Sequence, residues 1–400
     1  MSSTTAAAPV SNIDPFDEEV LADPFAAHEE LRELGAAVWL EGYGVWGMAR
    51  HEHVHAALND PVTFCSSAGV GLSDFRKEAP WRPPSLLLEA DPPDHTRARH
   101  AITKVLSPAV VRSLRATFTA EAQRIFDGLE GRDRIDGVHE VAEPFPLKVF
   151  PDAVGLPADG REHLLPYGGM VFNGFGPRNR LFDRAMASAD AVRSWITAHC
   201  RRDALTPGGL GDRIHAVAAE EGYSPEQSAL LVRSFLSAGV DTGVHGLGNA
   251  LLCFAENPDQ YALLRDDPSL ARAAFEEVVR YESPVQTFFR TTTREVDVDG
   301  TSIPAGDKVL LFLGAANRDP RQWEDPNKFD IVRRAVGHVG FGSGIHACVG
   351  QMMARLEGEI VLTELARRAT ALEVAGPVVR QLSNTLRGLD NLPLAVMSAA

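Results

Sequence analysis

The feature that most restricts the fold of this 400-residue chain is a long, apolar segment with a helical pattern in its second half. Ser224 is a predicted N-cap, and Gln227 completes a capping box with it. The dipeptide Asn257-Pro258 ends the pattern. We therefore predict one helix over 225–256, about 48 Å long at about 1.5 Å per residue. Because the segment is so apolar, we expect this helix to cross the middle of the domain.

Glycines are unusually frequent in the middle of this predicted helix. Gly239, Gly243 and Gly246 share one helical face, and each glycine costs about 1 kcal/mol relative to alanine. Two explanations stay open: close packing against another helix, or a flat, rigid body lying against this face. Asp241 and Thr242 lie in the same stretch. An acidic group in an apolar helix needs either a hydrogen-bonding partner or a function.

The rest of the chain is mostly helical in pattern, with few strand-like runs. Strands are expected only at 36–49, 285–298 and 308–313, with a tight turn at Asp299-Gly300. There is no regular alternation of strands and helices, which argues against a Rossmann fold. We predict a mainly α fold with small β-sheets, organised as a single domain over 13–400. The small, polar segment 1–12 is predicted to be a disordered tail. Helical patterns are expected near 24–35, 51–58, 93–104, 107–130, 138–154, 158–172, 180–202, 211–220, 269–282 and 349–369.

Charge and cysteine content restrict the partners and the compartment. The net charge is −15 and the pI about 5.3, which argues against nucleic acid and anionic membranes as partners. Charged residues interrupt the most apolar stretch, so no membrane span is expected. The four cysteines show no CxxC spacing, and segment 1–12 lacks the features of a signal peptide. A reducing cytoplasm is the expected location.

One cysteine lies in a glycine-rich loop, FGSGIHACVG, at residues 341–350. Cys348 directly precedes a helical pattern, and free amides at a helix N-terminus favour a thiolate, which is a good ligand for a soft metal. Glycines at 342, 344 and 350 allow special backbone conformations or the close approach of another body. An inert buried cysteine is the simplest alternative. A zinc site with His338 and His346 matches no standard spacing.

This loop resembles the haem-binding loop of cytochromes P450. Further motifs agree in order along nearly the whole chain after residue 12. Glu277-Val-Val-Arg280 resembles the family's ExxR pair, and Arg333 matches the arginine that joins it. The stretch 238–242 resembles the oxygen-activating acid–alcohol pair, and the stretch 95–99 resembles the helix that binds a haem propionate.

The resemblance implies a cytochrome P450 fold that binds haem b, with O2 as co-substrate and Cys348 as the axial iron ligand. It implies catalytic roles for Asp241 and Thr242 in oxygen activation. Glu277, Arg280 and Arg333 would form a buried structural network; without the resemblance, the first two would be an ordinary exposed ion pair. The residues expected to hold the haem are His95, Arg99, Arg290, Phe341, Gly342, His346 and Gly350.

Electrons must come from another protein, since no flavin or iron–sulfur motif occurs in the sequence. The resemblance implies a small iron–sulfur ferredoxin and a flavin-dependent NAD(P)H ferredoxin reductase. Basic residues between Arg97 and Arg115 form either a surface that attracts this ferredoxin or an ordinary solvated helix face. Many members of the family have a nonbasic residue at the position of His245. His245 either titrates near neutral pH or packs against other helices.

A narrower resemblance concerns the substrate. Several stretches, among them TFCSSAGVGLSDFRKEAPWRPPSLLLEADPPDHTR and HLLPYGGMVFNGFGP, are similar to bacterial P450s that oxidise para-substituted benzoates, notably 4-methoxybenzoate. Loops carry specificity, so similarity there is informative. It implies that Arg82, Ser85 and Ser234 bind the carboxylate, with Arg233 behind them. The implied contacts of the aromatic ring are Leu88, Phe172, Phe175, Ala238, Val285 and Phe288.

The predicted function is O-demethylation of 4-methoxybenzoate to 4-hydroxybenzoate and formaldehyde, with the protein positioning the para substituent. Hydroxylation of another aromatic acid, such as a cinnamate or an alkylbenzoate, is the main alternative. A peroxide-driven P450 and a haem sensor are the others, and neither explains why both Asp241 and Thr242 are present.

Overall fold

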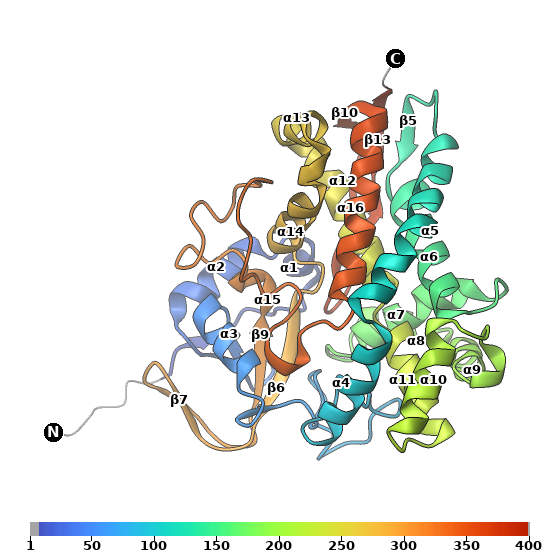
Figure 1. Ribbon diagram of the computed structural model, residues 1–400. Helices are drawn as coiled ribbons and strands as arrows, with labels where there is room; N and C mark the ends of the chain where they lie inside the picture. The colour runs from blue at the N-terminus through green and yellow to red at the C-terminus, as the bar shows by residue number, and fades with distance from the viewer. Residues whose placement is uncertain (1–7, 399–400) are drawn as a thin grey trace.

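The computed structural model describes residues 8–398. Helices account for most of the chain, and the strands form small sheets beside and at one end of the helical body (Figure 1). The mainly α fold with small β-sheets is therefore confirmed. The six-stranded sheet with β9 and β6 lies on one side, and α5 and α16 lie side by side on the other.

The long apolar segment forms two helices, α11 (Pro225–Leu236) and α12 (Asp241–Glu256), so the prediction of one helix over 225–256 is wrong. Its start was predicted correctly. The Ser224 hydroxyl accepts a hydrogen bond from the Gln227 amide, and the Gln227 side chain accepts one from the Ser224 amide.

The interruption between α11 and α12 has a local cause and a packing cause. The Thr242 hydroxyl donates to the carbonyl of Ala238 at 2.8 Å, a type of side chain–backbone bond that bends helices. Gly239 lies against the ring of Phe150, where a Cβ atom would come within 2.1 Å of the ring. At this glycine the close-packing explanation is correct.

The other helices follow the predicted patterns with some differences. The expected helix over 180–202 is divided into α8 and α9, and the segment 138–154 begins with a π-helical turn at Val138–Ala142. The short helices α1 and α15 and the helix α13 were not predicted. The helices are α1 (Glu18–Ala22), α2 (Phe25–Leu34), α3 (His51–Asn59), α4 (Asp94–Val105), α5 (Pro108–Asp127), α6 (Pro144–Val154), α7 (Leu164–Asn173), α8 (Arg180–Met186), α9 (Ala189–His199), α10 (Leu210–Glu220), α13 (Pro258–Asp266), α14 (Ala271–Glu282), α15 (Leu313–Ala316) and α16 (Gln351–Arg368).

The largest sheet joins both ends of the sequence. Its order is β1-β2-β3-β9-β6-β4, with β3 parallel to β9 and β9 antiparallel to β6. The three predicted strand regions all contain strands, and the tight turn at Asp299-Gly300 forms with φ values of 54° and 83°. The strands of this sheet are β1 (Val10–Ser11), β2 (Val38–Leu40), β3 (Val45–Met48), β4 (Phe64–Cys65), β6 (Thr287–Thr292) and β9 (Lys308–Phe312).

Three smaller sheets complete the fold. They contain β10 (Ala369–Val374), β13 (Pro393–Ser398) and β5 (Arg134–Asp136); β11 (Val379–Leu382) and β12 (Arg387–Asn391); and β7 (Val296–Val298) and β8 (Thr301–Ile303). The strands after residue 368 were not predicted from the sequence.

The predicted disordered tail over 1–12 is wrong where the structure describes it. Val10–Ser11 is strand β1, which pairs in parallel with β2, and Ser11 is buried. Residues 1–7 of that prediction lie outside the described residues.

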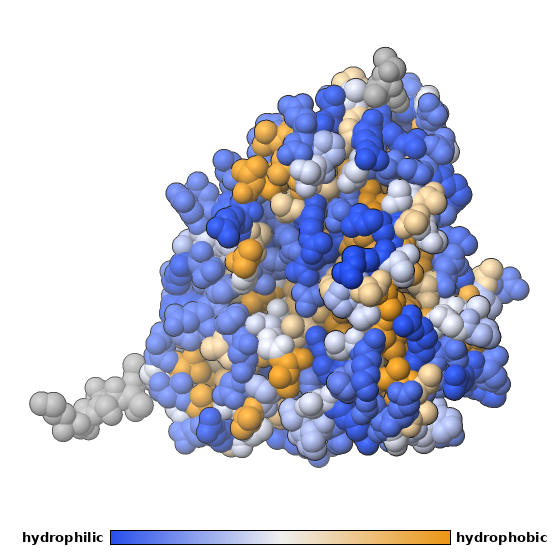
Figure 2. All heavy atoms as spheres, viewed as in Figure 1, coloured by the Kyte–Doolittle hydropathy of each residue, from blue (hydrophilic) through white to orange (hydrophobic). Residues whose placement is uncertain are grey.

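Hydrophilic residues cover most of the face shown in Figure 2, and hydrophobic residues gather near its middle, where α16 and α4 lie. The apolar residues of α12 are inside: Leu247, Leu251 and Phe254 are all buried in the largest hydrophobic core cluster. Within residues 8–398, no helix combines the length and the hydropathy needed to span a bilayer.

Candidate haem and substrate site

A cavity of about 250 Å³ lies between α12 and the cysteine loop. Gly243 and Gly246 of α12 line it, as the flat-body explanation predicts, and Gly239 lines it just before the helix begins. The predicted cofactor and substrate residues on its wall are Arg82, Ser85, Leu88, His95, Arg99, Phe172, Phe175, Ser234, Ala238, Thr242, Val285, Phe288, Arg290, Phe341, Gly342, His346, Cys348 and Gly350.

The cysteine loop is held in a tight conformation just before α16. The Cys348 amide donates to the carbonyl of Phe341 at 2.7 Å. Gly342 and Gly344 have φ values of 68° and 66°, in the left-handed region that favours glycine. A Cβ atom on Gly344 would lie 2.5 Å from the carbonyl oxygen of Leu58, so this glycine is also required by packing against α3.

The Cys348 side chain is exposed toward the cavity and otherwise surrounded by protein. Burial raises the pKa of its thiol, while hydrogen bonds from the amides of Gly350 and Gln351 and the charge of Arg99 lower it. The amides at the start of α16 therefore lower the pKa of the thiol, as the sequence predicted. With no cation facing the sulfur, burial has the larger effect and the pKa of the thiol is raised. A metal cation bound to the sulfur would lower this pKa and favour the thiolate.

Basic side chains from three elements meet in one part of the cavity. His95 and Arg99 come from α4, Arg290 from β6 and His346 from the cysteine loop. The two imidazole ring centroids lie 4.2 Å apart. Both ring nitrogens of His95 and Nε2 of His346 are buried without a hydrogen-bond partner among residues 8–398.

These groups lack an anion. Burial lowers the pKa of Arg290 to about 10 and that of His346 to about 3, so both environments disfavour charge as they stand. Buried polar groups without partners are costly. The two carboxylates of a haem would satisfy them, and Cys348 would supply an iron ligand on the same cavity wall. The residues present therefore fit an iron porphyrin.

Asp241 and Thr242 point to different places. Thr242 lines the cavity, whereas Asp241 is buried against Gly168 of α7, where any Cβ atom would lie 2.3 Å from the carboxylate. Its Oδ1 atom has no hydrogen-bond partner in the described chain. Burial, with a smaller effect from Glu143, raises the pKa of Asp241 well above its usual range, which favours a protonated carboxyl.

His245 is buried and packs against strand β12. A Cβ atom added to Gly388 of β12 would lie 1.9 Å from the Nδ1 atom of His245. Burial lowers the pKa of His245 to about 4, so the prediction that it titrates near neutral pH is wrong.

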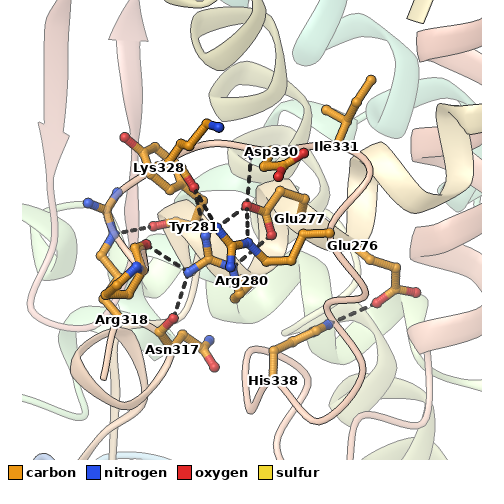
Figure 3. A network of polar contacts seen from close by, with 12 residues as sticks. Glu276, Glu277, Arg280, Tyr281, Asn317, Arg318, Lys328, Asp330, Ile331 and His338 are labelled. Carbon is orange, nitrogen blue, oxygen red and sulfur yellow. Dashed lines mark hydrogen bonds and ion pairs between the residues drawn. The ribbon is translucent and has the colours of Figure 1, made fainter. Parts of the chain in front are cut away.

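The Glu277–Arg280 pair is fully buried. Both side chains are 0 % exposed, and the Arg280 guanidinium donates two hydrogen bonds of 2.7 Å to the Glu277 carboxylate. Figure 3 shows Arg280 between Glu277 and Asn317, whose carbonyl accepts a third bond at 2.8 Å. Arg333 reaches Glu277 at 3.2 Å. The alternative of an exposed ion pair is therefore wrong, and none of the three predicted structural residues lines the cavity.

At the predicted carboxylate site, Arg82 already has an acidic neighbour. Its Nη1 atom lies 3.2 Å from a carboxylate oxygen of Glu89, and both side chains are buried. The Nε atom of Arg82 is buried without a partner among residues 8–398. The hydroxyls of Ser85 and Ser234 lie 2.8 Å apart on the cavity wall.

Arg233 does not line the cavity. Its guanidinium donates to the carbonyl of Pro83 at 2.6 Å and so supports the loop that carries Arg82 and Ser85. Burial lowers the pKa of Arg233, and the nearby Tyr167, whose hydroxyl has no partner in the described residues, raises it. Arg233 therefore lies behind the other predicted carboxylate ligands, as expected.

Aromatic rings form the apolar wall. Phe175 contacts Phe172 at a centroid distance of 5.9 Å and Phe288 at 5.7 Å, both in edge-to-face geometry. These three rings come from α7, the loop after it and β6. The cavity is thus apolar around a few polar groups, which is typical of a small-molecule site.

Sequence reasoning missed Glu89, Tyr167 and Glu357. Glu357 lies on α16 and lines the cavity opposite Gly243, where a Cβ atom would be 3.2 Å from Oε2. Burial raises its pKa to about 8. Glu89 follows three leucines and Glu357 lies in a helical pattern, so only their unexpected burial sets them apart from ordinary surface acids.

The basic residues proposed as a docking surface are partly neutralised. Lys104 pairs with Glu221 at 2.6 Å, and Arg115 pairs with Glu359 at 2.9 Å. Arg99 turns inward and donates to the carbonyl of Ala347 in the cysteine loop. The zinc alternative has no geometric support, because residues 8–398 contain no group of three His, Cys, Asp or Glu side chains arranged to hold a metal ion.

Comparisons with known proteins agree with this geometry. Residues 210–370 match the family model described as cytochrome P450. The chain is 56% identical to cytochrome P450 CYP199A2 of Rhodopseudomonas palustris, over 98% of this chain and 96% of that protein. It is 34% identical to cytochrome P450 107B1 of Saccharopolyspora erythraea, over 96% and 98% of the two chains.

Solved structures agree as well. Cytochrome P450 CYP109Q5 from Chondromyces apiculatus superposes with a TM-score of 0.82 at 30% identity, over 97% of this chain and 98% of that one. Members of the family are monooxygenases that use haem b and O2. The chain belongs to the cytochrome P450 family and is a haem-dependent monooxygenase.

Proposed function

We propose that this P450 oxidises para-substituted benzoates, and that its reaction is the O-demethylation of 4-methoxybenzoate to 4-hydroxybenzoate and formaldehyde. The observation that carries the proposal is one cavity lined by Cys348 at the haem site and by the buried, incompletely satisfied Arg82 elsewhere on its wall. A flat, apolar ring with a single anionic end matches this combination of groups.

The charge balance supports an anionic ligand. Arg82 and Arg233 bring two positive charges to this end, and Glu89 brings one negative charge. An arginine binds a carboxylate best through paired N–H donors, and the Nε–H of Arg82 is still available. The hydroxyls of Ser85 and Ser234 add neutral donors beside it. A benzoate would therefore be held by its acid end, with its ring among the phenylalanines.

The protein contributes position and proton handling. When bound, haem b supplies the activated oxygen. Phe172, Phe175 and Phe288 restrict the ring to one orientation and exclude water, so that the para substituent faces the haem. Oxidation of a methoxy C–H bond gives a hemiacetal, which loses formaldehyde and leaves the phenol. Thr242 offers a hydroxyl to the cavity, and the buried Asp241 carboxyl behind it is a proton donor.

P450s of this bacterial class take electrons from a ferredoxin and a reductase. We propose a small iron–sulfur ferredoxin and a flavin-dependent NAD(P)H reductase, and the cytoplasm, where NAD(P)H is available, as the location. The part-neutralised basic side chains of α4 and α5 are the proposed docking surface; they adjoin the cysteine loop through Arg99.

The test is a panel of para-substituted benzoates, each added to the ferric protein while the optical shift that accompanies loss of the haem water is recorded. We expect 4-methoxybenzoate to give a large shift and uncharged anisole to give almost none. With ferredoxin, reductase and NADH, formaldehyde and 4-hydroxybenzoate should form in equal amounts. A large response only to cinnamates or alkylbenzoates would replace the proposed substrate, and equal binding of anisole would overturn the carboxylate site.

A further inference from the structure

A buried lysine holds a loop behind the aromatic wall. Lys308 lies on β9, and its ammonium donates hydrogen bonds to three backbone carbonyls: those of Ala68 at 3.1 Å, Gly69 at 2.8 Å and Gly71 at 3.0 Å. The residue is 7 % exposed. All three N–H groups of the ammonium are therefore used, and all by one short turn of the chain, residues 68–71.

This turn touches the substrate cavity through Phe175. The amide of Leu72 donates to the carbonyl of Phe175 at 2.8 Å. Gly71 lies so close that a Cβ atom there would be 2.7 Å from the Cα atom of Phe175. The turn and the backbone of Phe175 are thus in direct contact, and the Phe175 ring forms part of the cavity wall.

The same turn is also joined to β6, which carries a second ring of the wall. The carbonyl of Val70 accepts a hydrogen bond from the amide of Phe289 at 3.0 Å. The neighbouring residue, Phe288, lines the cavity and contacts Phe175 edge to face. Phe175 and Phe288 are two of the three aromatic rings around the predicted ligand. Their positions therefore depend on the position of the turn at residues 68–71.

We propose that Lys308 is a positioning residue for the substrate pocket. Its ammonium acts as an internal cation that draws the carbonyls of residues 68–71 together and thereby fixes Phe175 and Phe288. A neutral amine has only two N–H groups, so it cannot bond all three carbonyls. An apolar side chain removes the donor of the Gly69 and Gly71 carbonyls, each at a cost of about 1–3 kcal/mol, while the carbonyl of Ala68 keeps its bond from the amide of Phe75 at 3.1 Å.

Several charged groups face this ammonium. From the loop, Asp74 favours its charged form and Arg76 opposes it; from β4, Cys65 favours it; from β6, Arg290 opposes it. Burial is the largest effect, and the pKa of Lys308 is lowered to about 8. The lysine therefore loses its proton within a pH range in which a benzoate stays ionised.

The first test compares Lys308→Met with Lys77→Met, an exposed lysine of the same loop that lies 3.4 Å from Asp74. Binding is followed as the optical shift of the ferric holoprotein on addition of 4-methoxybenzoate. We expect Lys308→Met to weaken binding about tenfold to hundredfold, with the haem content unchanged, and Lys77→Met to alter it less than about twofold. Equal binding by Lys308→Met and the native protein would overturn the proposal.

The second test is made on the native protein, with Lys308→Met as its control. In the native protein, affinity should be highest below pH 8 and should fall as pH rises through about 8, because substrate binding favours the ordered turn and the turn requires the ammonium. Lys308→Met should show no such fall. An unchanged affinity of the native protein between pH 7 and about 9.5 contradicts the inference.

The inference does not depend on which acid the enzyme oxidises. If no benzoate binds, 4-phenylimidazole serves as the probe. This uncharged ligand is expected to bind at the haem and to extend into the same pocket. Its weaker binding to Lys308→Met would then support the role of Lys308 while the benzoate proposal fails. Equal binding of 4-phenylimidazole to native protein and Lys308→Met would reject the role of Lys308.

Discussion

The guanidinium of Arg82 lies 3.2 Å from the carboxylate of Glu89, and both side chains are buried beside the proposed substrate site. The same carboxylate oxygen accepts a hydrogen bond from the amide of Ser85 at 2.6 Å. The arginine that is proposed to bind the substrate's carboxylate is thus already balanced by a carboxylate of the protein. A substrate anion bound as proposed would share Arg82 with Glu89.

Glu89→Gln should therefore strengthen benzoate binding about three- to tenfold, because the amide oxygen still accepts from Ser85 but no longer competes for the charge of Arg82. The affinity is measured by spectral titration of the ferric protein with 4-methoxybenzoate. Glu78→Gln, which removes an exposed acid 3.6 Å from Arg178, is the control and should change nothing. Weaker binding by Glu89→Gln would show that the acid organises the loop more than it competes.

Arg82→Ala should weaken 4-methoxybenzoate binding by at least about tenfold and leave haem content unchanged, since a charged hydrogen bond contributes about 1.5–3 kcal/mol. Anisole binding should not respond. Arg178→Ala is a matched control, because this arginine is 70% exposed at a neighbouring small pocket. If Arg82→Ala binds the benzoate normally, another group holds the carboxylate.

Glu277→Gln should destabilise the protein by about 3–5 kcal/mol, because it leaves the 0 % exposed Arg280 without its charge partner. Thermal unfolding and the haem-to-protein ratio are the measurements. The pair Glu121–Arg124 has the same i,i+3 spacing with an exposed arginine. Glu121→Gln should cost less than about 1 kcal/mol. Similar losses in both variants would argue against the buried network.

Glu357→Gln should remove part of the pH dependence of stability. The folded protein raises the pKa of Glu357 from 4.5 to about 8, so it holds a proton that the unfolded chain releases between these values. The free energy of unfolding should therefore fall as pH rises through this window, by up to about 1.4 kcal/mol per pH unit. Unfolding midpoints at pH 5 and 8 should differ less in the variant. An identical difference would mean that Glu357 is charged when folded.

Asp241→Asn should slow turnover while the haem and substrate bind as before. The amide has nearly the same size, so it fits beside Gly168, but it cannot give up a proton as the buried carboxyl can. NADH consumption and product formation should both be measured at several pH values. An unchanged rate would remove Asp241 from the proton path, whereas loss of haem would indicate a structural role.

The local motifs could be recognised from the sequence because each depends on a few residues that lie close together in the chain. The glycines around Cys348 adopt the left-handed backbone that only their lack of a Cβ atom makes easy, and the Glu277–Arg280 spacing puts both side chains on one helical face. Together with the ordered series of motifs, these residues identified the family, and they predicted Cys348 as the haem ligand and the basic groups around it.

Tertiary structure decided the contacts between distant segments. The break between α11 and α12 depends on Phe150 packing at Gly239, and the burial of Asp241 depends on the missing side chain of Gly168. Glu89 looks like a surface acid until its loop folds over Arg82, and Lys308 looks like an ordinary strand lysine until the turn at 68–71 surrounds it. A sequence pattern records which side chains share a face. Only packing determines which distant backbone meets that face, and so whether a charge there is solvated, paired or buried.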